Sequence, residues 1–91
     1  MVSRSSERQT IEMIKEAFGA QVKLLRTEQG MTQEELSQRS GLAIRFLQDV
    51  EAGNKQASIT TVFKLADGLG IAPDQLLSDT FKDWQKAGKP E

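Results

Sequence analysis

Cysteine, histidine and tyrosine do not occur in this chain of 91 residues. Without cysteine there is no disulfide framework and no thiolate metal site. Without histidine as well, serine–histidine catalysis, cysteine–histidine catalysis and ordinary zinc sites are excluded. An enzyme would have to use carboxylate, lysine or serine chemistry, and no pair of these residues is placed by a recognisable motif. We therefore expect no enzymatic activity, no metal and no cofactor.

Long apolar segments are missing too. No apolar run approaches the roughly 20 residues that a membrane-spanning helix needs, and the polar start MVSRSSERQ is not a secretory signal. A cytoplasmic protein with no membrane partner is therefore expected. Aromatic residues make up 5% of the chain and hydrophobic residues 37%, which predicts a small core of leucine, isoleucine and valine. A chain of this length forms one domain, near the lower limit for a single stabilising core.

The chain carries no excess of positive charge. Twelve basic and thirteen acidic residues give a net charge of −1 and a sequence pI near 5.5. DNA-binding domains are often strongly basic, because phosphate contacts supply most of the non-specific affinity. The composition therefore argues mildly against a nucleic-acid partner, unless folding turns the acidic side chains away from a basic surface.

The most informative stretch, residues 31–53, predicts two short helices joined by a tight turn. Thr32 offers a side-chain oxygen to cap the first helix, and Glu35 stands three residues on, which completes a capping box. Gly41 can adopt the left-handed conformation that ends a helix and turns the chain. The second helix has an inward pair, Leu47 and Val50, and four residues that point elsewhere, Ile44, Arg45, Gln48 and Asp49.

Before this stretch, a long amphipathic helix is predicted from Thr10, where apolar residues begin to recur every three or four positions. Gly19 weakens this helix by roughly 1 kcal/mol relative to alanine, which indicates either a break or a close helix contact. Gly30 is expected to end it. The inward stripe consists of Ile11, Ile14, Phe18, Val22 and Leu25.

Two further helices are predicted after the central pair. Ser58 caps the first and Gly70 closes it, and Pro73 is well tolerated in the first turn of the second. Their inward residues are Val62, Leu65, Ala66, Leu69, Leu76 and Leu77.

The sequence therefore predicts an all-α fold of five short helices. A single domain is expected over residues 10–85, with possible helical extensions at both ends. Residues 1–9 are expected to form a flexible lead, and residues 86–91 a flexible tail. We find no repeat, no low-complexity segment and no alternation typical of strands.

Several positions of the central helix pair follow a known pattern, namely Gln33, Ser37, Gly41, Leu47, Val50 and the ending Glu51-Ala52-Gly53. In these positions the chain resembles the helix-turn-helix of the Xre family of phage and bacterial repressors. The helix-turn-helix spans residues 32–52, and the resemblance extends over about residues 18–77. The run F-L-x-x-V-E-x-G looks most like restriction–modification controller proteins and small phage repressors. The resemblance implies a compact five-helix, repressor-like domain of bacterial or phage origin.

In such domains the second helix enters the major groove and its first residues reach the base edges. The resemblance therefore implies base contacts from Ile44, Arg45, Gln48 and Asp49. Arg45 can donate to guanine O6 and N7, and Gln48 can pair with adenine N6 and N7. Ile44 can only pack on a thymine methyl, and Asp49 can accept from cytosine N4 but repels phosphates. The alternative is that Arg45 and Gln48 merely solvate an exposed helix.

Four residues are candidates for contacts with DNA phosphates: Thr32, Gln33, Asn54 and Lys55. The family uses a glutamine at the position of Gln33 for this purpose, and helix-start amides add to the anion site. Thr32 is first of all a cap. Lys55 lies in the loop after the reading helix, and the alternative for it is an ordinary solvated surface lysine.

Domains of this type generally bind two half-sites as symmetric dimers. The resemblance therefore implies a double-stranded operator and a homodimer, with no small-molecule substrate. We expect the two-fold contact at the last helix, through Leu77, Phe81 and Trp84. The face that carries Ile11 and Ile14 is the competing surface.

The favoured function is a sequence-specific transcriptional regulator, a repressor or controller protein that binds a pseudo-palindromic operator. The alternative is a protein-interaction module, or an antitoxin, which uses the same helix pair to bind a protein. The acidic balance and Ile44 favour this alternative. The salt dependence of DNA binding separates the two, because a phosphate footprint gives a steep negative slope.

Overall fold

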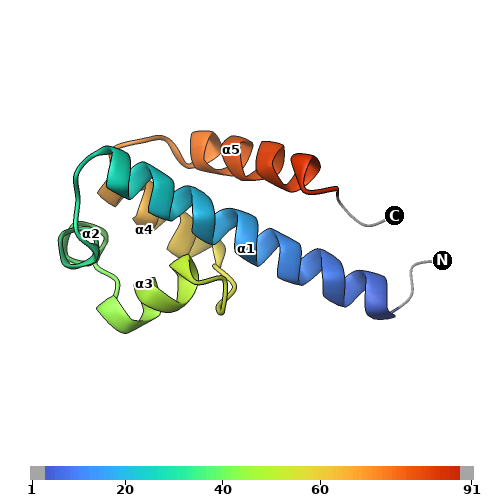
Figure 1. Ribbon diagram of the computed structural model, residues 1–91. Coiled ribbons are helices and arrows are strands. Elements are labelled where there is room, and N and C mark those ends of the chain that lie inside the picture. Colours follow the sequence, from blue (N-terminus) through green and yellow to red (C-terminus); the bar gives the residue numbers. More distant parts are fainter. Residues whose placement is uncertain (1–3, 89–91) are drawn as a thin grey trace.

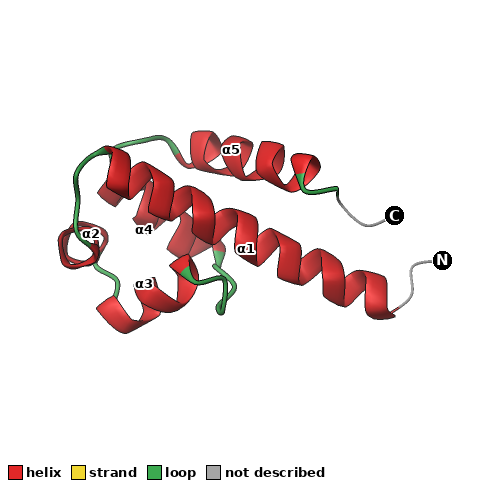
Figure 2. Ribbon diagram, viewed as in Figure 1, coloured by secondary structure: helices red, strands yellow, loops and turns green. Residues whose placement is uncertain are grey.

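A computed structural model describes residues 4–88, and five α-helices follow one another along this segment (Figure 1). They are α1 (Arg4–Glu28), α2 (Gln33–Ser40), α3 (Ile44–Glu51), α4 (Ile59–Leu69) and α5 (Pro73–Lys86). Residues 4–88 contain no strand (Figure 2), so the expected all-α fold of five helices is confirmed. None of the helices in this segment combines the length and the apolar character that a membrane crossing requires.

The long helix α1 is the element on which the others are assembled. It contacts α3, α4 and α5, and α2 packs mainly on α4. Helix α5 runs back along α1 in the opposite direction, and the first turns of α1 project beyond its end (Figure 1). The molecule is consequently elongated, with principal extents of 42 × 22 × 19 Å.

The hydrophobic core lies between the helices and receives side chains from all five. The inward residues predicted for α4 are all buried, and so are Leu47 and Val50 of α3. Met31, in the loop before α2, is a core residue that the helical pattern did not indicate. The core consists of Phe18, Val22, Met31, Leu36, Leu47, Val50, Val62, Leu65, Ala66, Leu69 and Leu76.

Part of the expected N-terminal lead is helical. Residues 4–9, expected to be flexible, belong to α1, whereas residues 1–3 lie outside the described segment. This segment lacks the apolar periodicity that predicts a helix from sequence. A helix that is already nucleated extends through residues of good helix propensity, such as Glu7, Arg8 and Gln9, without apolar contacts. At the other end, α5 closes at Lys86, and residues 89–91 of the expected tail lie outside the described segment.

The apolar stripe of α1 is only partly inward. Phe18 and Val22 are buried as predicted, but Ile11 is 43% exposed and Ile14 37% exposed. The reason is that the first turns of α1 extend past the body of the domain (Figure 1), so that no other helix of residues 4–88 covers them. Ile14 lies closer to the body and lines a cavity together with Leu77. In α5 the split is similar: Leu76 is buried, and Leu77, also predicted inward, is 44% exposed.

Gly19 does not break α1, and the second possibility, a close helix contact, is the one observed. A Cβ at Gly19 would collide with the carbonyl oxygen of Val50 and lie 2.9 Å from that of Glu51. Glycine therefore lets the backbone of α1 touch the last turn of α3. Since Val50 and Glu51 close α3, this contact helps to set the position of that helix.

Candidate nucleic-acid interface

The turn between α2 and α3 has the geometry that the sequence predicts. The hydroxyl of Thr32 accepts from the amide of Glu35 at 3.1 Å, and the Thr32 amide donates to the Glu35 carboxylate at 3.1 Å. This is a complete capping box. Gly41 has φ +74°, in the left-handed region, and its N–H donates to the carbonyl of Ser37. The chain then turns and enters α3 at Ile44.

Helix α3 divides sharply into an inner and an outer face. Leu47 and Val50 have no exposed surface, whereas the side chain of Arg45 is 84% exposed. Ile44 and Gln48 are also exposed, so three of the four predicted base contacts stand on the outer face. A helix this short is stabilised by its buried face rather than by intrinsic propensity. Its outer residues are therefore available for another purpose.

Asp49, the fourth predicted base contact, is placed beside Arg45. The Arg45 Nε lies 3.9 Å from the Asp49 carboxylate, one helical turn away, and the Asp49 side chain is 28% exposed. An ion pair this exposed and this long contributes little stability. The pair places the positive charge of Arg45 next to the negative charge of Asp49 on α3.

A buried ion pair joins the end of α1 to the end of α3. Arg26 Nε and Nη2 donate to the two Glu51 carboxylate oxygens at 2.7 and 2.9 Å, and Nη1 donates to the carbonyl of Met31 at 2.8 Å. The side chains of Arg26 and Glu51 are only 10% and 4% exposed. The hydrogen bond with Glu51 raises the pKa of the Arg26 guanidinium, although burial acts in the opposite direction. The Arg26 guanidinium is therefore charged at neutral pH.

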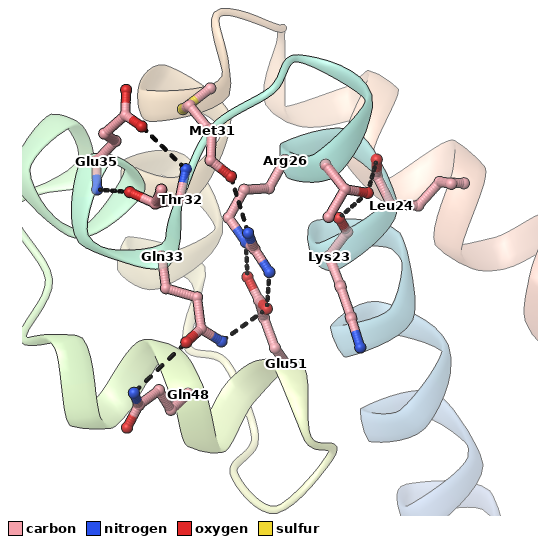
Figure 3. A network of polar contacts seen from close by, with 10 residues as sticks. Lys23, Leu24, Arg26, Met31, Thr32, Gln33, Glu35, Gln48 and Glu51 are labelled. Carbon is pink, nitrogen blue, oxygen red and sulfur yellow. Dashed lines mark hydrogen bonds and ion pairs between the residues drawn. The ribbon is translucent and has the colours of Figure 1, made fainter.

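Two glutamines extend this pair to the outer face of α3. The Gln33 amide nitrogen donates to Glu51 Oε1 at 3.1 Å, and the Gln48 amide nitrogen donates to Gln33 Oε1 at 3.4 Å (Figure 3). We call Arg26, Glu51, Gln33 and Gln48 the α3 network. It connects the first residue of α2 with the candidate base-reading helix. No sequence pattern points to Arg26, and Glu51 stands out only as part of the motif Glu51-Ala52-Gly53, because no spacing rule pairs residues 25 positions apart.

The predicted phosphate contacts lie at two places around α3. Thr32 and Gln33 stand at the start of α2, and Gln33 reaches α3 through the α3 network (Figure 3). Asn54 and Lys55 follow the end of α3 and are exposed; the Asn54 amide donates to the carbonyl of Asp49 at 2.9 Å. The structure therefore separates the four residues into two groups, one on α2 and one in the loop after α3.

The predicted dimer residues lie along α5. Leu77 is 44% and Phe81 49% exposed, whereas Trp84 is half-buried. The rings of Phe81 and Trp84 are 6.1 Å apart and inclined by 49°. Ile14 and Leu77 line the same small cavity of about 130 Å³, which is bounded by α1, α5, the loop residues 55–57 and Val62 of α4. The competing surface on α1 is therefore continuous with the α5 surface.

Comparison with known proteins gives a consistent result. The Helix-turn-helix family matches residues 22–76, which is more than half of the chain. An uncharacterized HTH-type transcriptional regulator of Sinorhizobium fredii, y4dJ, is 33% identical over 67 residues, covering 74% of this chain and 87% of that regulator. Control protein C.BamHI of Bacillus amyloliquefaciens is 31% identical over 64 residues, covering 69% of this chain and 79% of that protein.

Solved structures agree with these relatives. The crystal structure of the restriction–modification controller protein C.AhdI from Aeromonas hydrophila superposes with a TM-score of 0.66 at 37% sequence identity. That match covers 68% of this chain and 94% of the controller protein. The fold and the turn between α2 and α3 thus agree with the sequence relationship. The chain belongs to the Xre-type helix-turn-helix family of DNA-binding transcriptional regulators, and it is similar to restriction–modification controller proteins.

Proposed function

We propose that this protein binds a pseudo-palindromic DNA operator as a homodimer in the bacterial cytoplasm and thereby regulates transcription from a nearby promoter. The observation that carries the proposal is the division of α3. Leu47 and Val50 are completely buried, while Arg45 and Gln48 stand on the opposite, exposed face. Repression is the default action, because a dimer on an operator occludes the promoter; a controller-type protein both activates and represses.

The outer face of α3 supplies the proposed base contacts. Arg45 donates to guanine O6 and N7, and Gln48 pairs with adenine N7 and N6. Ile44, which is 37% exposed at the first position of α3, packs on a thymine methyl. Asp49 supports Arg45 through their ion pair, and it can accept from cytosine N4.

Phosphate contacts from both sides of α3 orient the helix in the groove. At the start of α2, the Gln33 side chain and the Thr32 hydroxyl donate to one phosphate. The Thr32 hydroxyl can do so because only its oxygen is used in the capping box, where it accepts from Glu35. Asn54 and Lys55 bind the backbone beyond the end of α3. The near-neutral total charge is compatible with this footprint, because Glu51 is paired with Arg26 inside the protein and faces no phosphate.

The proposed two-fold contact is formed by α5. Leu77 and Phe81 present apolar surface, and Trp84 supports the Phe81 ring. Each subunit then places one α3 in successive major grooves, about 34 Å apart along the duplex. Ile14, which adjoins Leu77, extends the same surface onto α1.

A second candidate function is a protein-interaction module or antitoxin. It is favoured by the exposed Ile44 on α3 and by the acidic first turn of α2, which carries Glu34 and Glu35. Such a surface suits a protein partner with basic and apolar groups.

The experiment that tests the proposal is a mobility shift of the protein on the DNA upstream of its own gene, at two salt concentrations. A discrete, salt-sensitive complex that outcompetes random DNA supports an operator-binding regulator. A folded protein that gives no shift at low salt contradicts it and favours the protein-interaction module.

A further inference from the structure

In the α3 network, the buried Glu51 carboxylate is hydrogen-bonded to the side-chain amide of Gln33, which is in turn hydrogen-bonded to that of Gln48. We propose that Glu51 and Gln33 are positioning residues for Gln48, and that they hold its amide in the orientation that reads adenine. The inference rests on the proposed function, in which α3 lies in the major groove. It goes further by assigning part of the base specificity to residues that touch no base.

Glu51 restricts the groups that can approach it. An ionised carboxylate only accepts hydrogen bonds, and Glu51 is buried in its pair with Arg26, with 4% of its side chain exposed. Oxygen Oε1 already accepts from Arg26 Nη2 at 2.9 Å. Any further group that approaches Oε1 must therefore present a donor.

The orientation of the Gln33 amide follows from this restriction. Its amide faces Glu51 Oε1 at 3.1 Å, so the NH2 group has to be turned toward the carboxylate and the carbonyl oxygen away from it. The opposite orientation would place two acceptors against each other in a partly buried site. Glu51 thus determines which end of Gln33 faces Gln48.

The orientation of the Gln48 amide, on α3, depends in turn on Gln33. Because Gln33 presents its oxygen, Gln48 has to present its NH2 group, and the two atoms are 3.4 Å apart. One hydrogen of that NH2 group is then used within the protein. The other hydrogen and the carbonyl oxygen remain, and they are the donor and acceptor that adenine N7 and N6 require. Preorganising the amide also lowers the entropy cost of ordering this exposed side chain on DNA.

Gln33 also binds phosphate in our proposal, so its two roles must be separated by the measurement. A phosphate contact affects all DNA sequences equally, whereas an oriented reader affects one base pair. We define the discrimination ratio as the affinity for the operator divided by the affinity for an operator substituted at the base pair that Gln48 reads. This ratio reports only the effect of an oriented reader, because a change in a phosphate contact cancels in it. That base pair is the one whose substitution ceases to matter in the variant Gln48→Ala.

The test is a set of binding titrations with wild-type protein, Gln48→Ala, Gln33→Ala and the double variant, on both DNAs. The proposal predicts that Gln33→Ala lowers the discrimination ratio by about tenfold, nearly as much as Gln48→Ala, and that the double variant loses little more. The control is Lys55→Ala, a phosphate candidate outside the α3 network, which lowers both affinities and leaves the ratio unchanged.

The variant Glu51→Gln tests the role of the Glu51 carboxylate, provided that circular dichroism shows the variant folded; it too should lower the discrimination ratio. An unchanged ratio in Gln33→Ala overturns the inference, even if affinity falls, since Gln33 is then a phosphate contact alone. So does a Gln48→Ala variant that retains discrimination at every base pair. If wild-type protein has no preference for any DNA sequence, the proposed function itself fails, which is a separate result.

Discussion

Gly19 of α1 lies against the carbonyl oxygen of Val50 in α3, so closely that a Cβ on Gly19 would collide with it. This contact predicts that a glycine-to-alanine substitution in α1 destabilises the protein, which is the opposite of its usual effect in a helix. In a helix, alanine is ordinarily more stable than glycine by about 1 kcal/mol. Here Gly19→Ala is expected to lower the free energy of unfolding by about 1–3 kcal/mol, because the helices must separate. Urea unfolding measures it, with the exposed Lys23→Ala as a control expected to change stability by under about 0.5 kcal/mol.

The buried pair of Arg26 and Glu51 predicts a non-additive pair of substitutions. Arg26→Met leaves the Glu51 carboxylate buried without its partner and should cost about 3–5 kcal/mol. Adding Glu51→Met should recover most of this loss, because two apolar side chains then pack in the same place. Urea unfolding of the single and double variants checks both values. A single variant within about 1 kcal/mol of wild type would show that water compensates the charge.

The same pair makes a prediction about pH. The Glu51 hydrogen bond raises the pKa of Arg26 in the folded protein. The resulting stabilisation is therefore complete below the pKa of arginine in the unfolded chain, and it is lost only as the pH rises through the still higher folded-state pKa. The difference in stability between wild type and the double variant Arg26→Met/Glu51→Met, which leaves no charge buried at this place, should accordingly stay constant between about pH 6 and pH 9. A difference that changes across this range would contradict an ionised pair.

Lys55 in the loop after α3 predicts an effect that does not depend on DNA sequence. Lys55→Ala should weaken binding to operator and to random DNA by the same factor. The slope of log affinity against log salt should become less negative by about 1, because one phosphate contact is lost. Fluorescence anisotropy at several salt concentrations measures both, with Lys82→Ala on α5 as the control. An unchanged slope would show that Lys55 is only solvated.

The α5 surface predicts the effect of a charge at the proposed two-fold contact. Phe81→Glu should convert the dimer into monomers and weaken operator binding, because it buries a carboxylate between two subunits. The control is Leu24→Glu, which should remain dimeric. Leu24 and Phe81 are equally exposed, at 48% and 49%, but Leu24 lies at the other edge of α5, beside Lys82 and Lys86. Sedimentation velocity distinguishes the two species. If both variants remain dimeric, the contact lies elsewhere.

Local chemistry in the sequence was sufficient for much of the fold. The capping box at Thr32, the turn at Gly41 and the cap at Ser58 depend on residues three or four positions apart, and all three are observed. The two faces of α3 follow from the same short-range periodicity. Contacts between distant segments are different in kind: the pairing of Arg26 with Glu51 depends on how α1 crosses α3, which no local pattern encodes.

The ends of α1 illustrate a second limit. Apolar spacing marked Ile11 and Ile14 as inward, but periodicity shows only which residues share a face and not whether another element covers it. The role of Gly19 cannot be predicted from the sequence for the same reason. A glycine in a helix is compatible with a break or with a close helix contact, and the position of the neighbouring helix determines which of the two occurs. At the candidate interface, the outward residues of α3 can be predicted from the sequence, but the hydrogen bonds of the α3 network, which join distant residues, cannot.

The central claim, that the outer face of α3 reads bases, is tested most directly at Arg45. Wild-type protein and Arg45→Ala should be titrated against the operator, a scrambled duplex and operators with single base-pair substitutions. The account predicts that Arg45→Ala costs about 1–3 kcal/mol on the operator and abolishes the preference for guanine at one base pair, while binding to the scrambled duplex changes little. An equal loss on operator and scrambled DNA would contradict it, because Arg45 would then contact a phosphate rather than a base.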